Sequence, residues 1–193
     1  MTAADSSGLG NDGTLIGMTG TEWTAGILDG ALGFDGNAQY VDCGNDKSPQ
    51  LTEEVTISAW VKMEPANEDV YMGIAGKMAD GDNGYALVRH NSNVFRMWVG
   101  NIEGSDLEGV SSDVTYNDTD WHHVAGVVSN NTGYLYVDGV KQSEEAAVRL
   151  VDSEDYAYIG REYSDYDDRY WNGTIDDVRI YYRALSEQEI LYL

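Results

Sequence analysis

Residues 173–182 read GTIDDVRIYY, and residues 183–190 read RALSEQEI. The first stretch is typical of a β-strand, because isoleucine, valine and tyrosine favour extended backbone and Gly173 marks its start. The second is typical of a short helix, since Ser186 is a good N-cap and Glu189, three residues later, completes a capping box. We therefore predict a closing strand followed by one or two turns of helix.

Asp176 lies within the predicted closing strand. Strict alternation would place its side chain on the same side as Val178 and Ile180. If that side faces the core, the carboxylate needs a hydrogen-bond partner, an ion pair or a metal ion, because burying it alone is costly. We expect another part of the chain to supply this partner.

The closing stretch resembles the last strand of the laminin G-like, concanavalin A-like jelly-roll domains. Four earlier segments resemble the same family in the same order, and they are residues 7–15, 30–36 (GALGFDG), 55–62 (VTISAWVK) and 121–139, which run from WHHVA to LYVDG. The resemblance covers nearly the whole chain and implies an antiparallel two-sheet β-sandwich. The family defines a fold whose members differ in function, so function needs separate evidence.

The residue pattern favours the same all-β fold. Residues 55–63 alternate between an apolar face and a mostly polar one, and short strands separated by turn-rich loops recur along the chain. We predict a single jelly-roll domain over residues 1–193, excised from a larger protein, with a short C-terminal helix. The opening loop and the closing strand are expected to meet.

The charge composition limits which classes of molecule this chain is expected to bind. The 34 acidic and 11 basic residues give a formal charge of −23. Like charges repel, which argues against nucleic acid and anionic membranes as partners. Cation binding, a high-salt habitat or a merely acidic secreted domain are all compatible with this charge. No run approaches the roughly 20 apolar residues of a membrane span.

The resemblance implies a structural calcium ion where the opening loop, the Phe-Asp-Gly corner and the Ile-Asp-Asp strand end come together. The positions that carry over are Asn11, Asp35 and Asp176, with Asp5 and Gly36 as further ligands. Hard oxygen donors of this kind suit Ca²⁺. The alternative is that both carboxylates accept hydrogen bonds from turn N–H groups.

Two regions are candidate ligand sites. The polar sides of three predicted strands carry aromatic and basic residues, and a strip would form if these strands share one concave sheet, comprising Trp60, Arg96, Trp98, Tyr134 and Tyr136. The alternative is that residues 143–172 cover this face and make the rings a second small core. Residues 161–172, rich in tyrosine and aspartate, also suit sugar recognition or a self-packed loop.

Catalytic patterns are missing from the sequence. A retaining glycosidase needs two carboxylates about 5 Å apart, and the glucanases of this fold present Glu-x-Asp-x-x-Glu on one strand, a pattern that occurs nowhere here. Adjacent strand residues such as His122 and His123 point to opposite faces, so they do not form a metal pair. Cys43 is the only cysteine and has no histidine near it in sequence, which leaves a thiol nucleophile unsupported.

The sequence therefore predicts a non-catalytic, calcium-stabilised, lectin-like module of a secreted or cell-surface protein. Its expected partner is a glycan or surface polysaccharide, or else another surface protein. The alternative is a structural or adhesion domain that has no sugar site, and a glycan-active enzyme is the third reading.

Overall fold

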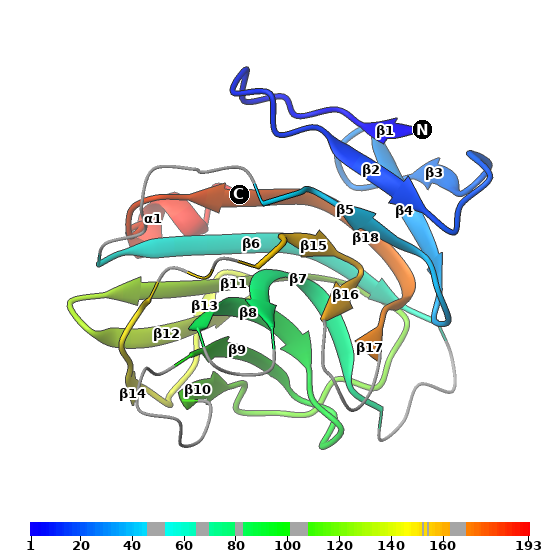
Figure 1. Ribbon diagram of the computed structural model, residues 1–193. Coiled ribbons are helices and arrows are strands. Elements are labelled where there is room, and N and C mark those ends of the chain that lie inside the picture. The colour runs from blue at the N-terminus through cyan, green and yellow to red at the C-terminus, as the bar shows by residue number, and fades with distance from the viewer. Residues whose placement is uncertain are drawn as a thin grey trace.

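The computed structural model describes residues 1–45, 53–64, 70–79, 83–100, 108–151, 153, 155–162 and 169–193. It is an open sandwich of two antiparallel sheets with about eight strands each, as the sequence predicts (Figure 1). The only α-helix among these residues is α1 (Glu187–Ile190). It has four residues, and no described helix is long and apolar enough to cross a membrane.

The first sheet has eight strands. In spatial order they are β1 (Thr2–Ala3), β2 (Gly13–Ile16), β5 (Tyr40–Asp42), β15 (Tyr158–Ile159), β7 (Met72–Ala79), β8 (Asn83–Arg89), β9 (Phe95–Val99) and β10 (Glu108–Ser111).

The second sheet is built around β6. Its order is β13 (Val140–Lys141), β12 (Thr132–Val137), β11 (Trp121–Ser129), β6 (Val55–Met63), β18 (Asn172–Tyr181), β4 (Gly30–Asp35) and β3 (Trp23–Ala25), with β14 (Ala146–Ala147) also paired to β12. Strands β16 (Arg161–Glu162) and β17 (Arg169–Tyr170) form a separate two-stranded antiparallel sheet.

The core lies between the two sheets. Alternation along β6 sends its apolar side chains inward, as predicted, where they join the inward side chains of β9 in one buried cluster that includes Val55, Ile57, Ala59, Val61, Met63, Phe95, Met97 and Val99. Trp171, which precedes β18, is also fully buried in this cluster. The polar or aromatic residues between these positions consequently face outward from either sheet.

Strict alternation fails in β18. Asp176 pairs with Trp60 of β6, whereas Arg179 pairs with Ser58, so an extra residue is accommodated between them as a β-bulge. Asp177 sits in this bulge with φ 47°. Val178 and Ile180 therefore join Ile175 on the core side, and Asp176 lies on the outer face. The predicted shared side for Asp176, Val178 and Ile180 is wrong.

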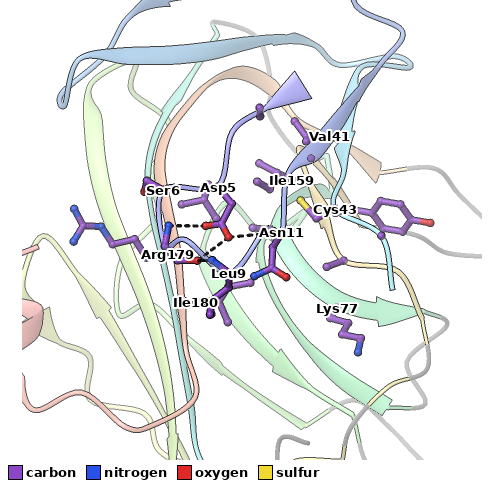
Figure 2. Close-up of a pocket in the computed structure, with 18 of the residues that line it drawn as sticks. Asp5, Ser6, Leu9, Asn11, Val41, Cys43, Lys77, Ile159, Arg179 and Ile180 are labelled. Atoms are coloured by element: carbon purple, nitrogen blue, oxygen red, sulfur yellow. Dashed lines mark hydrogen bonds between the residues drawn. The ribbon is translucent and has the colours of Figure 1, made fainter. Parts of the chain in front are cut away.

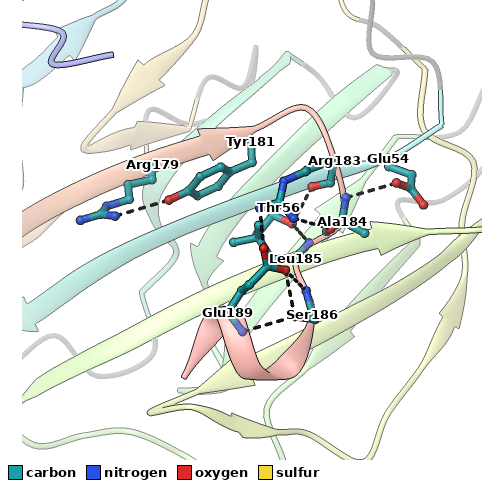
Figure 3. Close-up of polar contacts among 9 residues, drawn as sticks. All are labelled: Glu54, Thr56, Arg179, Tyr181, Arg183, Ala184, Leu185, Ser186 and Glu189. Atoms are coloured by element: carbon teal, nitrogen blue, oxygen red, sulfur yellow. Dashed lines mark hydrogen bonds and ion pairs between the residues drawn. The ribbon is translucent and has the colours of Figure 1, made fainter. Parts of the chain in front are cut away.

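The C-terminal segment covers the outer face of the second sheet. Leu185 and Ile190 pack with Ala125, Val127 and Tyr136 in a second buried cluster. Its anchor is the fully buried Thr56, whose Oγ1 donates to the Arg183 carbonyl and accepts from Leu185 N–H, each at 2.9 Å (Figure 3).

The start of α1 is closed by the predicted capping box. The Ser186 hydroxyl oxygen accepts a hydrogen bond from the Glu189 N–H, and the Glu189 carboxylate accepts one from the Ser186 N–H at 2.8 Å (Figure 3). Arg183 adds an ion pair to Glu189 at 2.6 Å. The helix is thereby fixed against the second sheet despite its length.

Candidate functional site

The outer face of the first sheet carries a group of partly exposed tyrosines around one arginine, which we call the tyrosine cluster: Tyr40, Tyr156, Tyr158, Tyr170 and Arg161. The Arg161 guanidinium carbon lies 4.8 Å from the Tyr40 ring centre, 5.3 Å from that of Tyr158 and 5.5 Å from that of Tyr170. Cation–π attraction of this kind holds a guanidinium and several rings in one fixed arrangement.

Sheet register explains why these rings meet. Tyr158 of β15 pairs with Asp42 of β5, and Ile159 pairs with Val41, both of which are in or against the core. Tyr158 and Tyr40 therefore point outward on neighbouring strands, with their ring centres 5.5 Å apart. Tyr156 stacks on Tyr158 at 6.3 Å and is half exposed, at 50%.

The hairpin β16–β17 closes over β7 beside this cluster. Gly73 of β7 makes the close approach possible, since a Cβ there would lie 2.0 Å from the Glu162 backbone nitrogen. Arg161 pairs with Tyr170 across the hairpin, and Glu162 pairs with Arg169. The hairpin thus contributes Arg161 and Tyr170 to the tyrosine cluster.

A second aromatic group on the same sheet face, the Trp98 cluster, comprises Tyr71, His90, Trp98, Arg96 and Arg169. The Arg169 guanidinium carbon lies 4.5 Å from the Tyr71 ring centre and 5.4 Å from that of Trp98, and its Nη1 donates to the buried Glu162 carboxylate at 2.6 Å. His90 bonds to the Tyr71 hydroxyl. Burial, together with Arg96 and Arg169, lowers the pKa of His90, which favours the neutral imidazole.

The predicted ligand strip is not formed. Arg96 and Trp98 lie on β9 of the first sheet, whereas Trp60, Tyr134 and Tyr136 lie on β6 and β12 of the second. All five point outward as expected, but from opposite faces of the sandwich.

The C-terminal segment occupies the second of these faces. Tyr136 is 6% exposed against Leu185, and Trp60 Nε1 donates to the Leu193 carbonyl at 3.4 Å. A second small core does form on this face, and its cover is the C-terminus. On the first sheet, Arg169 from residues 143–172 lies over Trp98, in part as the alternative held.

The predicted metal-binding residues occupy separate places. Asp35 pairs with Asn172 of β18, four positions before Asp176 (176 − 172), which corresponds to about 13 Å along a strand. Asp35 Oδ1 accepts N–H bonds from Asn37 and Ala38 in its own turn. Gly36, with φ 73°, belongs to the same corner.

Asp176 is satisfied by a different set of donors. Its Oδ2 accepts the N–H groups of Ile27 and Leu28 at 2.7 and 2.8 Å, and its Oδ1 accepts the Asp177 N–H at 2.8 Å. Gly26 leaves room for the carboxylate, since a Cβ there would lie 2.2 Å from Oδ2. The partner of Asp176 is thus the backbone of residues 27–28.

Asp5 and Asn11 form a third location, in the opening loop. The Asp5 carboxylate accepts the Ser7 hydroxyl at 2.7 Å and the N–H groups of Ser7 and Asn11 at 2.8 and 3.0 Å, and these bonds lower its pKa to about 2. In the part of the chain that the structure describes, no three His, Cys, Asp or Glu side chains are grouped to hold a metal ion. The five predicted calcium ligands therefore do not make one donor set, and calcium binding stays a prediction.

The opening loop and the closing strand do meet, at a cavity of about 550 Å³ (Figure 2). Asp5 and Asn11 line it together with residues 177–182 of β18 and its continuation, and Lys77 also lines it. Cys43 also lines it, and burial followed by the charges of Asp42 and Asp5 raises the pKa of its thiol to about 11. A thiol that stays protonated is a poor nucleophile.

The two adjacent histidines diverge as predicted. His122 bridges Asp118 and Asp138, with each nitrogen 2.9 Å from a carboxylate oxygen. His123 packs on the Trp60 ring instead, with ring centres 5.3 Å apart. These contacts tie β11 to its neighbouring turns, which is a structural role.

Sequence reasoning missed most of the tyrosine cluster. Of its members only Arg161 and Tyr170 fell in a region that the sequence singled out. The alternation of Tyr156 and Tyr158 was the available signal, because residues two apart share a face. Of the other aromatic residues singled out there, Tyr163 and Tyr166 lie outside the described residues, and Trp171 is buried in the core.

Comparison with known proteins agrees with the fold. A sequence model described as the concanavalin A-like lectin/glucanases superfamily matches residues 35–191. No curated protein matches the chain.

Several solved structures share the architecture at low sequence identity. Domain 4 of AbnA, a GH43 extracellular arabinanase from Geobacillus stearothermophilus, in complex with arabinotriose, has a TM-score of 0.72 and 20% identity over 97% of this chain and 90% of its own. The binding domain of Paraclostridial Mosquitocidal Protein 1 has a TM-score of 0.75 and 17% sequence identity, over 99% of this chain and 50% of its own.

The binding domain of botulinum neurotoxin DC in complex with SialylT has a TM-score of 0.71 and 15% sequence identity, over 97% of this chain and 47% of its own. The chain thus spans about half the length of the toxin binding domains and most of the arabinanase domain. Both sugar-bound neighbours are domains that bind glycans, and the family match extends over most of this sequence. The chain belongs to the concanavalin A-like lectin/glucanase superfamily.

Proposed function

We propose that this chain is a non-catalytic carbohydrate-binding module of a secreted or cell-surface protein, and that it binds glycans on the outer face of its first sheet. The observation that carries the proposal is the tyrosine cluster. Its rings are partly exposed and held by Arg161, on a face that the C-terminal segment does not cover. Sugar-bound neighbours of the same fold support it.

The chemistry of this cluster suits a sugar. The aromatic face of Tyr156 or Tyr158 offers an apolar surface to the C–H side of a pyranose or furanose ring, while tyrosine hydroxyls both donate and accept hydrogen bonds, as sugar hydroxyls do. The rings are already fixed by stacking and by the guanidinium, so little side-chain freedom would be lost on binding.

A glycan array followed by calorimetry tests the proposal. The array should contain arabino-oligosaccharides, sialylated glycans and uronate oligosaccharides, with arabinotriose as the first calorimetric probe. Tyr156→Ala combined with Tyr158→Ala should weaken binding of the retained glycan roughly tenfold, since aromatic contacts of this kind are worth about 1–1.5 kcal/mol. Tyr192→Ala removes an 82% exposed tyrosine from the C-terminal segment and is the matched control.

A structural or adhesion role without a sugar site is the alternative. Exposed apolar side chains at one edge of the second sheet favour it, namely Trp23, Ile27 and Leu28, which are 48%, 43% and 46% exposed. No binding anywhere on the array, together with retention on another surface protein that Trp23→Ser abolishes, would replace the sugar-binding proposal with this one.

A further inference from the structure

Arg96 has no polar partner among the described residues, and it lies on β9, the strand next to the edge strand β10 of the first sheet. Arg96 of β9 is half-buried, and within the described residues its side chain forms no ion pair and no hydrogen bond. This is unusual in a chain with 34 acidic and only 11 basic residues. Among the described residues its buried Nε has no acceptor, and a buried donor without an acceptor is unfavourable.

A second N–H donor lies beside it. Trp98, two residues along the same strand and 5% exposed, has its Nε1 buried without an acceptor. Both side chains lie against Gly109 of β10, where a Cβ would come within 2.6 Å of Arg96 Nε and 2.9 Å of Trp98 Cδ1, the ring atom bonded to Nε1. The missing side chain at Gly109 thus lets the two donors settle next to each other.

Two described carboxylates of neighbouring segments, Glu162 and Glu144, bond to other groups. Glu162 bonds to Arg169 at 2.6 Å. Glu144 accepts the backbone N–H of Ser111, the residue that pairs with Arg96 across β9 and β10, at 2.6 Å. Neither forms an ion pair with Arg96. In the described part of the chain, the N–H donors and the positive charge of Arg96 and Trp98 therefore have no matching acceptor.

From this donor set we infer that the glycan bound on this face carries a carboxylate, as a uronate residue does, and that Arg96 recognises that group. The inference rests on the proposed function. Sugar hydroxyls both donate and accept, whereas an ionised carboxylate only accepts, so a site of donors alone is matched to the carboxylate. The planar guanidinium also fits the two oxygens of a carboxylate.

The negative net charge of the chain is compatible with binding a negatively charged uronate. At 0.15 M salt the Debye length is about 8 Å, so most of the negative charge spread over the surface is screened from a carboxylate in contact with Arg96. Contact with the guanidinium is short-ranged and is screened much less.

Calorimetry at 0.15 M NaCl and pH 7 with trigalacturonate and its fully methyl-esterified form tests the inference. The free acid should bind more tightly, and Arg96→Gln should weaken it about tenfold while leaving the ester unchanged. Lys62→Gln, which removes the same charge from the outer face of the second sheet, should have no effect.

An NMR titration provides a second readout that does not depend on the stability of a variant. The Arg96 Nε–H and Trp98 indole N–H signals, assigned with Arg96→Gln and Trp98→Phe, should shift with trigalacturonate and not with its ester. Equal affinity for acid and ester, or unmoved N–H signals, overturns the inference. If trigalacturonate fails to bind while arabinotriose does, the uronate inference is refuted and the proposed function stands. If no glycan on the array binds, both are refuted.

Discussion

Replacing Asp176 tests whether its carboxylate holds the backbone of residues 27–28 or binds a metal ion. Asp176 is 6% exposed and accepts three backbone N–H groups, two of them from residues 27 and 28 across the edge of the second sheet. Asp176→Ala removes both carboxylate oxygens and with them all three hydrogen bonds. We expect the variant to be less stable than wild type, with residues 26–29 losing their attachment to β18.

The magnitude follows from the contacts. A hydrogen bond to a charged group contributes about 1.5–3 kcal/mol, but Ile27 and Leu28 are nearly half exposed, so water can replace part of what their N–H groups lose. We expect a loss of about 2–4 kcal/mol, which for a domain of this size corresponds to a Tm lower by roughly 5–15 °C. Asp176→Asn keeps one acceptor oxygen and should cost less, about 1–2 kcal/mol.

Urea unfolding and calorimetry, each in calcium and in EDTA, measure this effect. The midpoint should fall with an unchanged m-value, and the difference between wild type and Asp176→Ala should be the same with and without metal. Asp35→Asn is the control, because Asp35 serves only its own exposed turn, and its cost should stay below about 1 kcal/mol. If EDTA erased the difference between Asp176→Ala and wild type, Asp176 would be a metal ligand and the argument from N–H donors would be refuted.

Three further predictions follow from other contacts. Thr56→Val keeps the shape of a fully buried side chain but strands the Arg183 carbonyl and the Leu185 N–H, so we expect a loss of about 1–3 kcal/mol in urea unfolding and, by hydrogen exchange, earlier opening of residues 183–193. Burial alone would lower the pKa of His122, but its bonds to Asp138 and Asp118 outweigh burial and raise it above the ordinary 6.5. Its stabilising effect should therefore be complete below about pH 6.5 and be lost as pH rises through the raised value, a dependence of Tm on pH that His122→Gln should remove. If calcium binds at the opening loop, saturating metal should raise the wild-type Tm and Asn11→Ala should reduce that shift, whereas identical melting curves in calcium and EDTA would refute calcium stabilisation.

Which side of a strand faces the core could be predicted from the sequence, because alternation is a local property. Trp60, Trp98 and Tyr136 all point away from the core as expected. The capping box at Ser186 and Glu189 was equally local and is present. The family resemblance added the sandwich itself, which alternation alone does not specify.

Which sheet a strand joins could not be predicted in the same way. The order β12-β11-β6-β18-β4 brings together segments far apart in the chain, and β9 pairs with β8 and β10 in the other sheet. Nothing within residues 94–99 or 133–137 encodes that separation. The predicted strip failed for this reason. The tyrosine cluster was not predicted because its members come from β5, from β15 and the residues before it, and from the hairpin β16–β17.

The bulge in β18 shows how one extra residue changes the face of the sheet on which the following side chains lie. Aspartate tolerates positive φ better than most residues, and Asp177 adopts it at 47°, where the strand must accommodate an extra position. Had alternation been strict, Val178 and Ile180 would share the outer side with Asp176, and the apolar residues would face away from the core. Because Asp177 absorbs the mismatch, Ile175, Val178 and Ile180 all pack inward, while Asp176 turns outward to hold the backbone of residues 27–28. The Asp-Asp pair that suggested a metal ligand thus combines a loop anchor with the residue that makes the bulge.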